Sequence, residues 1–135
     1  MDVTDPRASE PTPLARMRLS SSRGIGVSGS TGASELVLDP RSGRPAASDV
    51  IVAVAIADSV ADAVAVSRAL LVGGSSRAGA LLSKTRRVES LLVVRSGPEP
   101  RVIASASLRG RLELLGELAA EPADGPRFLL PPSKL

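Results

Sequence analysis

Cysteine, histidine, tryptophan and tyrosine are all absent from this sequence, and phenylalanine occurs once, at Phe128. Without cysteine there is no disulfide framework, no thiolate nucleophile and no thiolate ligand for zinc. Without histidine the chain lacks the commonest general base and the commonest metal ligand of proteins. Its core must be built from valine, leucine, isoleucine and alanine, which bury less area per residue than aromatic side chains. We therefore expect marginal stability, or dependence on a partner.

Long apolar runs are also missing. No stretch of the sequence approaches the roughly 20 apolar residues that are needed to span a bilayer. Residues 1–6 are polar and acidic, unlike a secretory signal. The sequence as written predicts a cytoplasmic protein that has no membrane partner.

The charge balance is basic, with a formal net charge of +3 and a pI of about 10.5. A basic protein is a candidate for binding nucleic acid. The arginines are spread along the chain, however, with Arg86 and Arg87 as the only adjacent pair, and no aromatic residues lie among them to stack on bases. This pattern favours scattered surface charge, and we expect no nucleic-acid partner.

The order of apolar and polar segments predicts an α+β fold, a mixed sheet with helices packed on one face. Residues 50–57 are an unbroken apolar run, typical of a strand buried on both faces. A helix is expected from Asp58 or Ser59 to about residue 72, ended by Gly73 and Gly74. The other expected elements are strands at 14–19, 24–28, 35–39, 90–95 and 101–107 and helices at 75–84 and 108–120. The expected domain spans residues 14–120, between a disordered segment at 1–13 and a proline-rich tail at 121–135.

Two glycine-containing segments are candidates for binding loops. Gly24, Gly26 and Gly29 have the spacing of a dinucleotide-binding fingerprint, but the preceding strand and the following helix that this motif requires do not flank them. This favours a glycine- and serine-rich loop over residues 20–34, within which the strand at 24–28 lies. Residues 39–45 read Asp-Pro-Arg-Ser-Gly-Arg-Pro and predict a rigid turn, because Asp39 can bond the backbone ahead of it and Gly43 permits a positive φ. Taken alone, this segment is a tight surface turn.

The succession of these segments resembles the C-terminal half of the FAD:protein FMN transferases, the ApbE family, over residues 14–115. The segments are Gly-Val-Ser-Gly at 26–29, the turn at 39–45, the apolar strand and Ala-Asp-Ala at 61–63. The chain departs from the family pattern at three positions that matter for chemistry. Val27 and Val66 stand where the family has threonine, and Leu36 stands where it has histidine.

The resemblance implies which residues form the site. Ser28, Gly29, Asp39, Arg41 and Gly43 would contact a flavin nucleotide, and Asp62 would be a magnesium ligand. Asp58 lies four residues before Asp62, so both carboxylates could share one cation on one helical face. The alternative to metal binding is a structural role, with Ser59 as a helix N-cap and Asp62 in the first helical turn. No catalytic residue can be assigned, because no serine has a recognisable activating base.

By its resemblance the chain would use magnesium to transfer FMN from FAD to a serine or threonine of an acceptor protein, releasing AMP. Because a complete family member is at least about twice as long, a partner chain or a second copy would supply the missing half. The alternatives are a catalytically inactive remnant that serves as an interaction or structural domain, and a truncated reading frame. The first interpretation predicts FAD binding, the second a folded protein without it, and the third poor folding.

Overall fold

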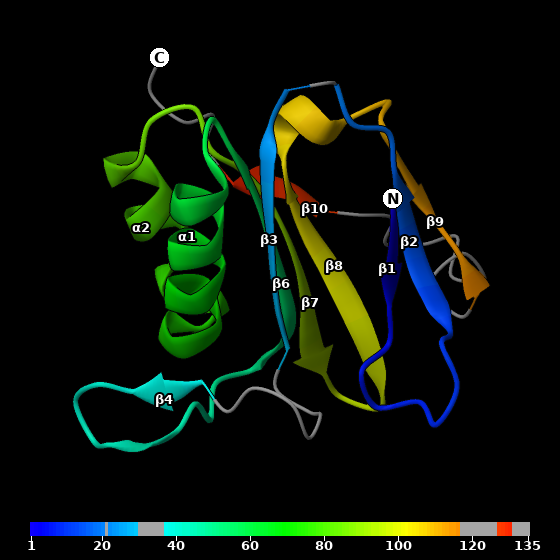
Figure 1. Cartoon of the computed structure of the whole chain (residues 1–135). Helices are drawn as coiled ribbons and strands as arrows, with labels where there is room; N and C mark the ends of the chain where they lie inside the picture. The colour runs from blue at the N-terminus through cyan, green and yellow to red at the C-terminus, as the bar shows by residue number, and fades with distance from the viewer. Residues whose placement is uncertain (21, 30–36, 117–126, 131–135) are drawn as a thin grey trace.

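Helices cover one face of a mixed five-stranded sheet, and a smaller sheet covers the other, in the computed structural model of the chain (Figure 1). The structure describes residues 1–20, 22–29, 37–116 and 127–130. The elements in order are β1 (Asp2–Thr4), β2 (Pro13–Met17), β3 (Gly24–Gly29), β4 (Leu38–Asp39), β5 (Arg44–Pro45), β6 (Val50–Ala57), α1 (Val60–Gly73), α2 (Ser75–Lys84), β7 (Glu89–Ser96), β8 (Glu99–Ser105), a 3-10 turn (Ala106–Leu108), β9 (Leu112–Leu114) and β10 (Arg127–Leu130).

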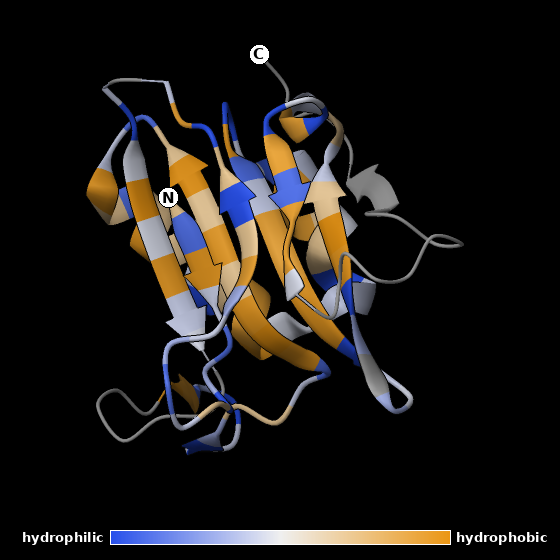
Figure 2. Ribbon diagram, turned by 90° about the vertical axis from the view of Figure 1, so that its right-hand side faces the viewer, coloured by the Kyte–Doolittle hydropathy of each residue, from blue (hydrophilic) through white to orange (hydrophobic). Residues whose placement is uncertain are grey.

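The five-stranded sheet has the order β10-β8-β7-β6-β3, and the smaller sheet has the order β1-β2-β9. Neighbours in the large sheet are antiparallel except β10, which is parallel to β8. Figure 2 shows apolar residues along the strands and hydrophilic residues near their ends. The α+β class and the mixed sheet with helices on one face are therefore confirmed, and the second sheet on the opposite face is an addition to the prediction.

Strand β6 divides the core into two clusters, and all eight of its residues are buried. Its larger side chains, Val52, Val54 and Ile56, face the smaller sheet. Alanines 53, 55 and 57 face the helices. Along this apolar run, large and small side chains therefore alternate between the two faces, whereas a half-exposed strand would alternate apolar and polar ones. The small face lets a helix approach the sheet closely.

Helix α1 lies directly on this small face and on the neighbouring edge strand β3. Gly24, Gly26 and Ser28 pair with the three alanines of β6. A Cβ atom built on Gly26 would lie 2.4 Å from the backbone carbonyl of Ala63. Gly24 and Gly26 are thus needed because α1 leaves no room for a side chain, and the dinucleotide-like spacing has a packing origin.

Local signals set both ends of α1 as the sequence predicts. The Ser59 hydroxyl accepts a hydrogen bond from the Asp62 N–H at 3.0 Å, which satisfies a free donor of the first turn. Gly74 has a φ of 79° and donates its N–H to the Leu70 carbonyl at 3.0 Å. No helix among the described residues is long and apolar enough to cross a membrane.

The structure differs from the prediction near both chain ends. Strand β1 lies within residues 1–13, where no regular structure was expected, because it pairs with β2 and buries Val3. Residues 112–114 are strand β9, paired with β2, and not part of a helix. Gly110 and Gly116 flank β9 with positive φ values of 79° and 57°, which a helix does not accept. Strand β10 lies within the expected tail.

Candidate functional site

The hairpin of β4 and β5 carries the turn that was predicted at residues 39–45. The Asp39 carboxylate accepts hydrogen bonds from the Arg41 N–H at 2.9 Å and from the Arg41 guanidinium at 2.9 and 3.1 Å. The Asp39 carbonyl accepts from the N–H of Gly43 at 2.8 Å, and Gly43 has a φ of 67°. The turn chemistry predicted for Asp39 and Gly43 is therefore confirmed, and this hairpin projects from the end of the helical layer (Figure 1).

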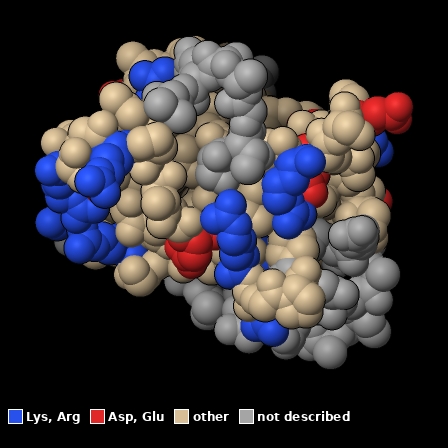
Figure 3. All heavy atoms as spheres, turned by 90° about the horizontal axis from the view of Figure 1, so that it is seen from below, with Lys and Arg blue, Asp and Glu red and all other residues tan. Residues whose placement is uncertain are grey.

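The electrostatics of the hairpin follow from the pair that Asp39 forms with Arg41. Hydrogen bonds from the Arg41 side chain, then from its backbone N–H, hold the pKa of Asp39 below its usual value, and the charges of Arg41 and Arg77 add to this. The same pair raises the pKa of Arg41. Arg41, Arg44 and Arg77 are all exposed. Basic side chains gather on the hairpin side of the face in Figure 3, where an anion would be attracted.

Arg41→Ala is expected to raise the pKa of Asp39 toward the value of an ordinary aspartate, which a carbon-detected NMR titration of the carboxyl group measures. A lowered folded pKa stabilises the fold above the unfolded pKa, and this stabilisation is lost as the pH falls through the folded pKa. The variant should lose that acid-side contribution, which is small because the pair is exposed. Arg44→Ala is the matched control. An equal pKa shift in that control would contradict the assignment.

Ser28 and Gly29 form the end of strand β3, and the structure does not place them in a loop. The Ser28 hydroxyl is buried and lies 2.9 Å from the Ser67 hydroxyl of α1. Ser67 also donates to the Val64 carbonyl at 3.0 Å. Ser67 lies one residue past Val66, about 100° around the helix from the position that would share a ligand with Asp62, so the sequence predicts no metal-binding role for it and did not reveal its pairing with Ser28. The signal that identifies it is its position four residues after the buried Ala63.

Asp58 and Asp62 have other partners than a metal. Asp58 forms ion pairs with Arg23 at 3.5 Å and with Arg87 at 3.3 Å. Asp62 accepts a hydrogen bond from the Ser59 hydroxyl at 2.7 Å, in addition to donating its own N–H to it. This reciprocal pair is the helix-capping arrangement that the sequence offered as the structural alternative.

The residues around Asp62 do not fit a magnesium ion. Magnesium prefers several hard oxygen ligands, but Val66 offers none and the Ser67 hydroxyl is buried against Ser28. Two guanidinium groups already neutralise Asp58, and the N-terminus of α1 repels a cation. Within the described ranges, no three acidic, histidine or cysteine side chains gather as possible ligands.

The predicted site residues divide into two groups. Strand β3 ends at Gly29 opposite the beginning of β6, close in sequence to the hairpin, so Gly29 and the hairpin lie toward the same end of the sheet. Asp58 and Asp62 lie at the start of α1, while Arg77, which acts on Asp39, follows its end. A helix of 14 residues is about 20 Å long. The flavin and metal candidates are therefore not brought together, and Leu36 lies outside the described residues.

Solved structures of flavin transferases share this fold. The flavin transferase ApbE from Vibrio cholerae has a TM-score of 0.56 and 24% identity over 66% of this chain and 30% of that chain. A histidine-to-glycine mutant of it has a TM-score of 0.54 and 24% identity over 64% and 27%. The apo form of the flavinyl transferase ApbE from Pseudomonas stutzeri has a TM-score of 0.55 and 26% identity over 67% and 30%. No protein-family profile and no curated protein matches the sequence.

These matches cover about two thirds of this chain but less than a third of each transferase. They agree with the order of segments from which the resemblance was inferred, and they support the fold without placing a ligand or a metal. The chain carries a partial ApbE-like domain.

Proposed function

We propose that this chain is a diverged flavin-transferase-like domain that binds a flavin nucleotide, and that FMN transfer requires further groups from a partner chain or a second copy. The observation that carries the proposal is the likeness to ApbE flavin transferases. Asp39, Arg41 and Gly43 would bind the nucleotide together with the end of β3 at Ser28 and Gly29. Because the Ser28 hydroxyl is engaged with Ser67, Ser28 and Gly29 would contribute through their backbone.

The basic hairpin supports a role in binding the phosphates of such a nucleotide. Arginine guanidinium groups bind phosphate oxygens as paired donors, and Arg41 and Arg44 are exposed on the hairpin. The turn holds the Arg41 backbone in place through Asp39. No reaction step is assigned to Asp62 or Asp58, since their surroundings do not fit magnesium. On its own, the chain is therefore expected to bind FAD without transferring FMN.

A titration of FAD with the purified chain tests this proposal. The protein has no tryptophan or tyrosine whose emission a bound flavin could quench, so the fluorescence of the flavin itself is the signal that reports binding. We expect saturable binding that is unchanged by adding magnesium. Arg41→Ala should weaken the binding about fivefold through loss of a charged phosphate contact. Arg86→Ala, which removes an exposed arginine outside the hairpin, is the matched control.

The other outcomes of this titration are informative. Magnesium-dependent binding that is lost in Asp62→Ala would contradict our assignment of Asp62 to helix capping. Absence of binding by a cooperatively folded chain would contradict the flavin proposal. It would favour the second candidate, an interaction or structural domain without catalysis. That candidate is supported by the ion pairs and the capping bond that engage Asp58 and Asp62.

A further inference from the structure

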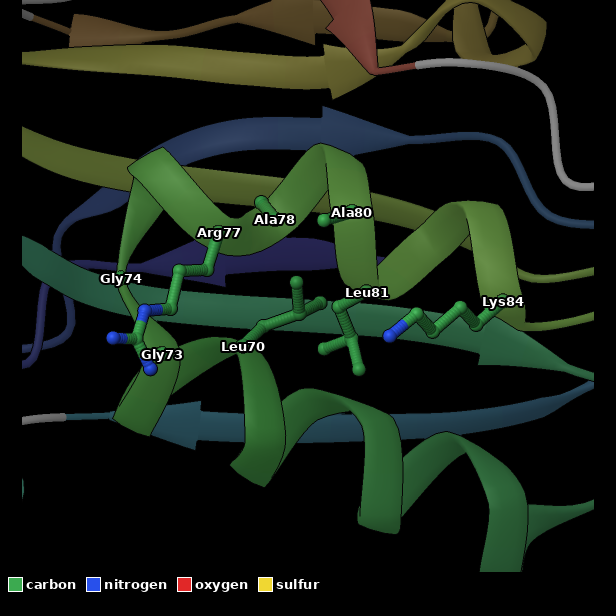
Figure 4. A pocket seen from close by; sticks show the side chains of 8 residues that line it. All are labelled: Leu70, Gly73, Gly74, Arg77, Ala78, Ala80, Leu81 and Lys84. Atoms are coloured by element: carbon green, nitrogen blue, oxygen red, sulfur yellow. The ribbon is translucent and has the colours of Figure 1, made fainter.

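A groove runs between the C-terminal half of α1 and helix α2, with a volume of about 260 Å³. Leu70 of α1 and Leu81 of α2 lie in its middle, and Figure 4 shows their side chains pointing toward each other. Arg77 lies at the end near Gly74, and Lys84 lies at the opposite end. The groove is thus apolar in its centre and basic at both ends.

Small residues explain why the two helices leave this space. Gly73, Gly74, Ala78 and Ala80 line the groove beside the two leucines. None of these side chains is long enough to reach across the gap between the helices. A water molecule needs two to four polar partners to be held in a cavity, and the centre of this groove offers almost none. Its apolar surface is therefore better satisfied by an apolar side chain than by solvent.

The two basic residues at the ends of the groove both belong to α2. Arg77 and Lys84 are seven residues apart in α2, so they lie on one side of the helix and about 10 Å apart along its axis. Both residues are exposed, and no acidic residue of the described ranges lines the groove. Two carboxylates near the Arg77 end of the groove are engaged elsewhere, since Asp39, whose charge interacts with Arg77, bonds Arg41, and Asp49, beside Gly74, bonds the Ser75 N–H at 2.9 Å. The groove therefore complements a ligand with two negative charges around an apolar centre.

We propose that this groove docks an acidic amphipathic helix of a partner protein. Acidic residues seven positions apart on that helix would face Arg77 and Lys84, and an apolar residue midway would enter the groove over Leu70 and Leu81. Helices commonly bind in this way, with anchors at positions 3, 4 and 7 along one face. The volume is below the range of about 300–1,000 Å³ that is usual for small-molecule sites, so the groove suits an anchoring side chain better than a cofactor. This proposal does not depend on flavin binding.

Fluorescence anisotropy of a dye-labelled, alanine-rich helical peptide tests the proposal. The peptide carries glutamates seven positions apart with leucines at the third and fourth positions between them, and a comparison peptide carries lysines in place of the glutamates. We expect saturable binding of the glutamate peptide only. Lys84→Glu should weaken this binding at least about fivefold, because attraction becomes repulsion. Arg86→Glu, which reverses an exposed charge just beyond α2, should change it less than about twofold.

Several results would overturn the proposal. Equal binding of the lysine peptide, or an unchanged dissociation constant in Lys84→Glu, would place the peptide elsewhere. If the folded chain did not bind the glutamate peptide at millimolar concentration, the groove would not be a docking site for an acidic helix. Self-association that disappears in Lys84→Glu, measured by sedimentation, would make a second copy the occupant. FAD titration of Lys84→Glu should match that of the unchanged chain, which separates a failure here from a failure of the flavin proposal.

Discussion

Gly26→Ala is expected to destabilise the protein by about 2–3 kcal/mol, the cost of forcing extra volume into a packed core. Alanine ordinarily favours a strand over glycine by about 0.5–1 kcal/mol, so propensity alone predicts the opposite sign. The new Cβ would lie 2.4 Å from the Ala63 carbonyl group and 2.6 Å from the Val64 nitrogen, which are backbone atoms that cannot rotate away. Helix α1 would have to move off the sheet. Urea unfolding followed by far-UV circular dichroism measures the loss.

Gly29→Ala in the same strand is the matched control. Its Cβ would lie 3.6 Å from the Pro6 side chain, which is an ordinary contact. This variant should be as stable as the unchanged chain or slightly more stable, because alanine loses less backbone entropy on folding. If Gly26→Ala unfolded at the same urea concentration as Gly29→Ala, α1 would not be seated on β3 as described.

Features of the fold that depend on neighbouring residues could be predicted from the sequence. The apolar run of β6, the Ser59 cap and the glycine end of α1 all follow from residues within one or two turns of each other. Strand β9 could not be found in this way. Its pairing with β2 joins Leu112 to Met17, far apart in sequence. A strand of three residues has too little periodicity of its own to reveal such a pairing.

The candidate site shows the same difference between features set by neighbouring residues and features set by distant ones. The bond of Asp39 to the Arg41 backbone N–H and the positive φ of Gly43 are local, and the sequence predicts them correctly. The capping role of Asp62 is local too, but it competes with a metal role that uses the same residue type. Only the ion pairs of Asp58 with Arg23 and Arg87, which come from other elements, show that this carboxylate is engaged. The sequence therefore predicted the geometry of the turn at Asp39 better than it predicted the surroundings of Asp58 and Asp62.

Ser67→Ala is expected to destabilise the protein by about 1–3 kcal/mol, the cost of leaving a buried polar group without its hydrogen bond. Ser67 is fully buried, and its loss removes the partner of the Ser28 hydroxyl, which is only 7% exposed. The better helix propensity of alanine offsets a few tenths of a kcal/mol. Ser28→Ala should cost less, about 1 kcal/mol, because Ser67 keeps its bond to the Val64 carbonyl. Urea unfolding of both variants measures this difference.

The double variant Ser28→Ala, Ser67→Ala separates the hydroxyl pair from general packing. Removing both hydroxyls leaves neither group unsatisfied, so the double variant should lose less stability than the sum of the two single losses. An additive result would mean that the hydroxyls do not bond each other across β3 and α1. A non-additive result would show that the two hydroxyls interact between β3 and α1, at the place where Gly24 and Gly26 let the helix approach the sheet.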